Sequence, residues 1–578
     1  MRQLLKPLLV LFALLPAGVA CAAAPSLAPA EAAYRQLAAE ILHDLYARNP
    51  SYATALGLHE YDAMLEDASR AAVDDETRAV ARFKTALEAI DPQALTLDSR
   101  LDRELLLHSL DARRIGNEEI RSWARNPDAY SSGITGAAFV IISRDYAPAA
   151  ERLKSLIARE LAMPAVLQQA RRNLDNPPRI YTEIAIDQLD GNQDFFKTTV
   201  VEAFADVKDP ALQARFKQAN DAVIAALGEY KTWLQKDLLP RSNGSFAWGA
   251  DTYRRMLLAE EMIDTPLDVL LAKAEADLRA NQALFAETAR RIDPTKTPME
   301  VLEALQKDHP KPENLLAETQ AELDALGRFM TDHHIVTIPP DSPPAQVKET
   351  PPFMRATTSA SMDTPGPFEQ AKLRGFYNMT LPDPSWSAEH TEDFMRQWFY
   401  PLITNTSVHE VWPGHYLQFL YAKQFPTDVR KVLGASSNSE GWAHYCEQMV
   451  IDAGFHAGQP QYRLAQLQDA LLRDARFIVG IKMHTQGMSY DQAVEFFQKE
   501  GNQPKSLAVS ESKRGTSDAL FGYYTMGKLA VLKLRADYQR KLGPAFKLQD
   551  FHDRFIAMGP LPLPLVREAM LGERGELF

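Results

Sequence analysis

Apolar residues recur every three or four positions along the chain from about Ala30 to His334, which predicts a succession of amphipathic helices. The pattern is clearest in residues 31–50, 211–240 and 266–292, which are rich in strong helix formers such as Ala, Leu, Glu and Lys. Strand and helix patterns do not alternate regularly, and no fixed-period repeat occurs. We therefore expect a mainly α fold.

The pattern changes in residues 335–368, where proline, serine and threonine become frequent. Proline lacks a backbone donor and fixes φ, so a helix cannot run through this segment. Three short strands are predicted instead, at residues 335–339, 355–362 and 374–380. Helical periodicity returns at His390 and continues to about Tyr538. The chain therefore divides near residue 335 into two parts, which we expect to share a core.

The N-terminus has the features of a secretory signal peptide over residues 1–24: Arg2 and Lys6, then an apolar stretch, then small residues. We therefore expect an exported, periplasmic protein. Cys21 leaves an alternative open, in which an acylated cysteine anchors the chain to lipid. Cys446 is the only other cysteine, so we expect no internal disulfide.

Composition narrows the classes further. The 578 residues are 46% apolar and 24% charged, with a net charge of −13. An acidic chain without a basic tract argues against a nucleic-acid partner. No segment after the signal is apolar enough to span a bilayer, so we expect no transmembrane span.

The stretch TSVHEVWPGHYLQFLY contains His409, Glu410 and His415. Zinc hydrolases often carry H-E-x-x-H, whose histidines share one helix face. Here the second histidine comes six residues later, about 240° around a straight helix. Pro413 interrupts the helix and Gly414 permits unusual dihedrals, so a bulge of two residues could bring both histidines together. The alternative is a kinked helix with two unrelated histidines.

Two other segments bear on this site. The dipeptide His59-Glu60 has no histidine four or six residues later, which shows that a His-Glu pair alone is weak evidence. The segment SSNSEGWAHYCEQMVIDAGF carries a polar helical stripe of Glu440, His444 and Glu447 beside an apolar one. A buried polar stripe needs partners, and a cation would provide one. Alternatively, Ser437 and Glu440 form a capping box.

Several motifs, taken together and in order, resemble one bacterial family, which is catalogued as domain of unknown function 885. They are His409-Glu410-x-x-Pro413-Gly414-His415-x-x-Gln418, Glu440-Gly441-Trp442-Ala443, and Tyr524-x-x-Gly527 with Leu534-Arg535. NPSYATALGLHEYD also fits, so the resemblance spans nearly the whole mature chain. The family is similar to HExxPGH, gluzincin-like zinc metallopeptidases. This implies a large helical shell around a deep channel, with a small β-sheet beside the zinc-binding helices.

The resemblance also implies roles for individual residues. His409, His415 and Glu440 would bind Zn²⁺ and leave a fourth position for water. Glu410 would be the general base that takes a proton from this water. Tyr524 would stabilise the oxyanion.

Further residues receive weaker roles. His444 and Glu447 would orient the ligands, and Tyr523 would contact the substrate. Tyr377 and Asn378 could lie on an edge strand that pairs with the substrate backbone. The alternative for Tyr523 and Tyr524 is that both are packing residues. The alternative for Tyr377 and Asn378 is an ordinary buried strand.

The sequence therefore predicts an exported zinc-dependent peptidase that hydrolyses short peptides. It would consist of a signal peptide (1–24), an N-terminal helical part (25–335) and a C-terminal catalytic part (336–578). Two other hypotheses stay open: a zinc amidase acting on a non-peptide or cell-wall substrate, and a non-catalytic binding protein with a vestigial metal site.

Overall fold

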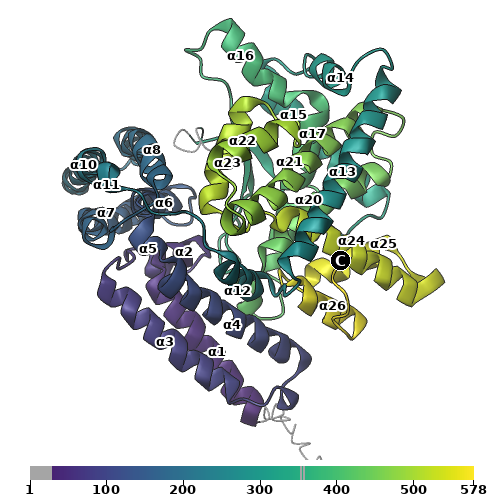
Figure 1. Ribbon diagram of the computed structural model, residues 1–578. Coiled ribbons are helices and arrows are strands. Elements are labelled where there is room, and N and C mark those ends of the chain that lie inside the picture. Colours follow the sequence, from purple (N-terminus) through teal and green to yellow (C-terminus); the bar gives the residue numbers. More distant parts are fainter. Residues whose placement is uncertain (1–28, 341, 352–354, 356–357) are drawn as a thin grey trace, which may run out of the picture.

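The computed structural model describes residues 29–340, 342–351, 355 and 358–578. The predicted signal peptide and Cys21 lie outside the described residues. The described part is mainly α with one small sheet, which confirms the predicted fold class (Figure 1). None of its helices is both long enough and apolar enough to cross a membrane.

The N-terminal helices follow the predicted periodicity. Residues 31–50 fall on α1 and the start of α2, residues 211–240 on α10 and α11, and residues 266–292 on α13. The helices are α1 (Pro29–Arg48), α2 (Pro50–Ala55), α3 (Arg70–Glu88), α4 (Leu97–Ile115), α5 (Ser122–Arg125), α6 (Asp128–Ile142), α7 (Ala149–Asn173), α8 (Arg179–Lys197), α9 (Thr199–Ala203), α10 (Pro210–Trp233), α11 (Leu239–Arg241), α12 (Ala250–Glu261), α13 (Leu267–Ile292), α14 (Pro298–Leu305) and α15 (Leu315–Asp332).

The sheet has the order β1-β3-β2, with β1 (Gln346–Glu349) parallel and β2 (Ala360–Asp363) antiparallel to β3 (Phe376–Met379). The predicted strand at residues 335–339 is wrong: this segment is irregular, and the backbone N–H of Thr337 donates to the Asp553 side chain instead of to a strand. The prediction also missed β1. Since β3 is paired on both sides and Tyr377 and Asn378 are buried, the edge-strand alternative for these residues is wrong and the alternative of an ordinary buried strand is confirmed.

Helices return after the sheet and continue beyond Tyr538, where the prediction ended them. They are α16 (Ala388–Met395), α17 (Tyr400–Glu410), α18 (His415–Ala422), α19 (Asp428–Val432), α20 (Ser436–Asp452), α21 (Pro460–Thr485), α22 (Tyr490–Lys499), α23 (Lys505–Ser517), α24 (Tyr523–Leu542), α25 (Leu548–Ala557) and α26 (Leu563–Leu571). Helix α20 packs along α24, and α13 packs along α21. The sheet lies beside α15 and α17.

Apolar side chains from both sides of residue 335 pack into one core, which includes Tyr34, Leu106, Trp442 and Val566. The buried residues of a second core lie within residues 130–238, mostly on α6, α7, α8 and α10, and Leu65 and Ala68 pack against them. These four helices lie to the left of the C-terminal helices in Figure 1, and α8 contacts α23. The division at residue 335 and the deep channel stay predictions.

Candidate metal centre

The chain breaks between α17 and α18, at the proline and glycine that the sequence singled out. His409 and Glu410 end α17, and His415 begins α18, so two helices replace the expected bulge in one helix. The backbone N–H of Gly414 donates to the carbonyl of Val408 over 3.0 Å. A Cβ on Gly414 would lie 1.8 Å from the carbonyl oxygen of His409, so only glycine fits here.

This break brings the two histidines together. The ring centroids of His409 and His415 are 4.8 Å apart, and the rings are nearly perpendicular. Trp442 on α20 donates its indole N–H to the carbonyl of Pro413 over 2.8 Å, which ties the break to the next helix. The apolar stripe of α20 thus fixes the loop, while the polar stripe of the same helix faces the histidines.

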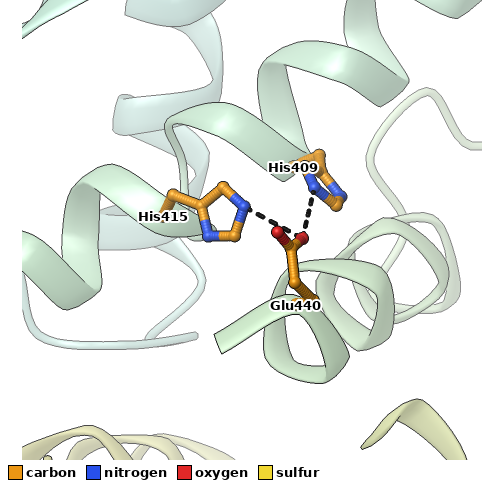
Figure 2. Close-up of side chains that lie close together, drawn as sticks. All are labelled: His409, His415 and Glu440. Atoms are coloured by element: carbon orange, nitrogen blue, oxygen red, sulfur yellow. Dashed lines mark ion pairs between the residues drawn. The ribbon is translucent and has the colours of Figure 1, made fainter. Parts of the chain in front are cut away.

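The carboxylate of Glu440 lies between the two histidines (Figure 2). Its Oε2 is 3.3 Å from Nε2 of His409 and 3.3 Å from Nε2 of His415. The ligand atoms of the three residues all lie within 4.8 Å of one another. A tetrahedron with zinc-ligand bonds of about 2.1 Å has edges of about 3.4 Å, so the two N···O separations match zinc coordination.

Glu440 does not cap its helix. The N-cap position of α20 is Ala435, which makes no side-chain capping bond. The buried carboxylate of Glu261 accepts the backbone N–H of Ser436 at 3.1 Å and that of Ser437 at 2.9 Å. The capping-box alternative is therefore wrong, because a glutamate distant in sequence caps the helix and leaves the Glu440 carboxylate to the histidines.

Glu447 holds the other nitrogen of His409. Its Oε1 lies 2.7 Å from Nδ1 of His409, and its Oε2 lies 3.2 Å from Nδ1 of His444. Arg473 contacts the same carboxylate at 3.1 Å, and the side-chain amide of Asn405 donates to it over 3.2 Å. A carboxylate at Nδ1 fixes the tautomer in which the Nε2 lone pair of His409 is free for a metal.

The charges of the centre are strongly coupled. Burial raises the pKa of Glu440, but the two histidines outweigh it and hold this pKa well below its usual range. Burial likewise lowers the pKa of His409, but the hydrogen bonds to Glu440 and Glu447 raise it to about 9. Burial lowers the pKa of His444 to about 3, so this imidazole is neutral at pH 7. Glu440 is therefore ionised at neutral pH, and a cation that displaces the proton of His409 would meet its negative charge.

Glu410 is half-buried at the end of α17, and its carboxylate has no hydrogen-bond or ion-pair partner among the described residues. Tyr377, fully buried on β3, lies close enough that the Glu410 charge raises the pKa of this tyrosine further, after burial. The neighbouring Asn378 is also buried and donates to Ser361 on β2 over 3.3 Å. Strand β3 is paired on both sides and therefore offers no free edge to a peptide backbone.

Tyr524 and Tyr523 begin α24, and the Tyr524 ring lies 6.2 Å from the His409 ring between centroids. Two glycines make this approach possible. A Cβ on Gly441 of α20 would lie 2.3 Å from Cα of Gly527 on α24. The helix backbones therefore touch where the family motifs have glycine, one residue after Glu440 and three after Tyr524.

Sequence reasoning missed several residues that contact this network. Asp469 and Arg473 on α21 support Asn405 and Glu447, and Arg514 on α23 donates to the hydroxyls of both tyrosines. For Arg473 the available signal was the run LLRDARFIVGIKMH, residues 471–484, in which charged residues interrupt an otherwise apolar helix; no comparable signal marks Asp469 or Arg514.

Comparisons with known proteins agree on the family. Residues 50–570 match the model of the family described as bacterial protein of unknown function (DUF885), and the chain belongs to this family. Among curated proteins, no sequence matches. A candidate lipoprotein of unknown function from Shewanella oneidensis has 26% identity and a TM-score of 0.78, over 93% of this chain and 99% of that one. A candidate lipoprotein from Colwellia psychrerythraea, at 17% identity, shares the fold with the same TM-score and coverage.

Proposed function

We propose that this protein is a zinc-dependent peptidase that hydrolyses short peptides. One observation carries the proposal: two imidazole nitrogens and a carboxylate oxygen converge on one point, and the residue that follows His409 is a glutamate, Glu410, without a partner among the described residues. A purely structural metal site has no use for such a free carboxylate.

The residues present fit a zinc ion. His409, His415 and Glu440 would hold it, and two imidazoles with one carboxylate are a donor set typical of catalytic zinc. When bound, zinc would supply a Lewis acid that polarises a carbonyl and lowers the pKa of water.

The protein's own residues supply the remaining chemistry. Glu410 takes a proton from the attacking water, whose hydroxyl joins the carbonyl carbon; the C–N bond breaks, and the proton passes to the leaving nitrogen. Arg514 donates to the Tyr524 hydroxyl over 3.4 Å, and no described acceptor takes the hydroxyl's own proton. Tyr524 can therefore donate to the carbonyl oxygen as charge develops, a contribution of about 3–4 kcal/mol. Glu447 keeps His409 oriented.

The location of the protein belongs to the same proposal. The structural relatives are described as candidate lipoproteins, and the sequence has a signal-like N-terminus with Cys21 at its end. We infer an exported, periplasmic protein that is either free or anchored through a lipid on Cys21. Mass spectrometry of the protein from a bacterial membrane fraction would distinguish the two forms.

The test compares Glu410→Gln with Glu60→Gln, a matched change in the exposed second His-Glu dipeptide. Zinc content is measured after purification, and kcat/KM is measured on a peptide library. We expect both variants to keep stoichiometric zinc. Glu410→Gln should lose at least ~100-fold in kcat, the usual contribution of a general base, and Glu60→Gln should match the wild type.

Full activity in Glu410→Gln would rule out the mechanism. Cleavage of cell-wall fragments but not of peptides would favour the amidase alternative. Zinc binding without turnover of either substrate class would leave the non-catalytic binding protein as the function.

A further inference from the structure

Three arginines surround Tyr524 beside the candidate metal centre. The guanidinium carbons of Arg473, Arg476 and Arg514 lie 5.6, 4.9 and 5.7 Å from the centre of its ring. The Tyr524 ring that they surround lies 6.2 Å from the ring of His409, between centroids. The cluster is therefore within reach of a substrate that occupies the centre.

Arg473 and Arg476 are almost fully buried in ion pairs. Arg476 makes a bidentate pair with Glu511, with both N···O distances at 2.7 Å. Arg473 pairs with Glu447 at 3.1 Å and with Asp469 at 3.4 Å. Both arginine side chains are only 10% exposed, so neither is free to bind a ligand.

Arg514 differs in exposure and in pairing. Its side chain is 36% exposed, and its Nε and Nη2 both donate to a single oxygen of Asp518 at 3.0 and 2.9 Å. Nη2 also donates to the hydroxyl of Tyr523 at 3.0 Å. Nη1 has no partner in the described part of the chain. Arg514 thus keeps open N–H donors on the side that solvent reaches.

We propose that Arg514 binds the terminal carboxylate of a peptide substrate, so that the enzyme removes short pieces from C-terminal ends. The inference rests on the proposed peptidase function. A guanidinium N–H group is the usual protein ligand for a carboxylate, and Nη1 of Arg514 has no partner among the described residues. Arg514 and His409 lie 5.7 and 6.2 Å from the centre of the Tyr524 ring, and an extended residue spans about 3.5 Å, so the released piece is at most about three residues long.

The experiment uses pairs of identical peptides that end either in a free carboxylate or in an amide. The wild type should prefer the acid by roughly 10- to 100-fold in kcat/KM, the value of one charge-assisted hydrogen bond. In Arg514→Met the ratio should fall to about 1, chiefly through a higher KM for the acid. Arg514→Lys keeps the charge and should restore part of the preference, which also controls for folding.

Tyr524→Phe is the matched control for the chemical step. This change should lower kcat on acid and amide equally and leave their ratio unchanged. If Arg514→Met lowers both substrates equally, Arg514 only positions Tyr524 and the proposal is wrong. Equal kcat/KM of the wild type on the acid and the amide peptide also overturns the proposal.

A binding measurement separates this proposal from the peptidase function. Calorimetry with the same peptide pair on the zinc-loaded Glu410→Gln protein needs no turnover. Tighter binding of the acid, abolished when Arg514→Met is added, supports the carboxylate site even if no peptide is cleaved. Equal binding of acid and amide overturns the site even if the wild type is a peptidase.

Discussion

The same dipeptide, His-Glu, stands in two regions of this protein with opposite outcomes. His59 lies at the surface of the N-terminal part, where its Nδ1 contacts Asp62 at 3.2 Å and its Nε2 contacts Glu369 at 2.9 Å. Its ring stacks on Tyr146, with centroids 3.8 Å apart. His409 also has carboxylates at both nitrogens, but its Nε2 shares one of them, Glu440, with a second histidine.

The difference teaches what makes a metal centre. At His59 each ring nitrogen contacts one carboxylate, and no second histidine of the described residues shares either of them. The histidine therefore cross-links the segments of Asp62 and Glu369. At His409 the Glu447 carboxylate contacts one ring nitrogen, and the Glu440 carboxylate at the other lies equally close to His415 and would be a ligand of the proposed zinc. The second histidine, delivered by a broken helix, distinguishes the two regions, and the predictions below test this distinction.

The largest effect is expected from Glu440→Gln, with Glu369→Gln as the matched change at the other histidine. Glu440→Gln removes the charged ligand, so zinc content and peptidase activity should both fall by more than the roughly 10- to 100-fold expected for a residue that only orients a ligand. Glu369→Gln should leave both unchanged. Zinc is measured by elemental analysis after dialysis. Equal zinc content in both variants would remove the distinction between the two regions.

The next effect concerns the carboxylate that orients the ring. Glu447→Gln should weaken zinc binding by about 10- to 100-fold, because His409 loses the acceptor that fixes its tautomer. Asp62→Asn makes the corresponding change beside His59 and should not alter zinc affinity. Competition with a chelator gives both affinities. Unchanged zinc affinity in Glu447→Gln would show that the contact between Glu447 and His409 contributes only to packing.

A third prediction tests the helix contact that brings Tyr524 to the centre. Gly441→Ala forces a Cβ against Gly527 and should destabilise the protein by about 1–3 kcal/mol. The control is Gly136→Ala on α6, in the second core. An added Cβ there would meet nothing within 4 Å, so this change should be neutral or stabilise the protein by up to ~1 kcal/mol. Thermal unfolding compares the two variants. A neutral Gly441→Ala would mean that α20 and α24 can separate without cost.

The same contrast shows what the sequence could predict. Helices such as α1, α10 and α13 follow from local periodicity, since their buried faces repeat along the chain. For His409 and His415, the proline and the glycine left two alternatives open, a bulge that brings the histidines together or a kinked helix with unrelated histidines. The resemblance to the family implied that Glu440 joins them. The sequence predicts a bulge or kink within one helix rather than two helices, because periodicity does not tell whether a helix continues or ends at a Pro-Gly pair.

Long-range contacts explain what could not be predicted. Nothing in Phe376–Met379 says that β1 and β2 pair on both of its sides, and four residues are too few for a reliable alternation. The capping of α20 by Glu261 and the support of Glu447 by Arg473 join residues from distant parts of the chain. Single-sequence patterns carry no information on such pairs.

The smallest effect should come from His59 itself and depends on pH. Burial lowers its pKa, but Asp62 and Glu369 raise it above the usual value overall. The protonated cross-link therefore adds stability below about pH 6.5, and this contribution is lost as pH rises through the folded-state pKa. The stability gap between wild type and His59→Asn should be wider at about pH 6 than at about pH 9, by less than ~1 kcal/mol, since the ring is partly exposed. Chemical unfolding at both pH values measures the gap, and a gap that widens toward high pH would contradict the assignment of His59 as an ionic cross-link.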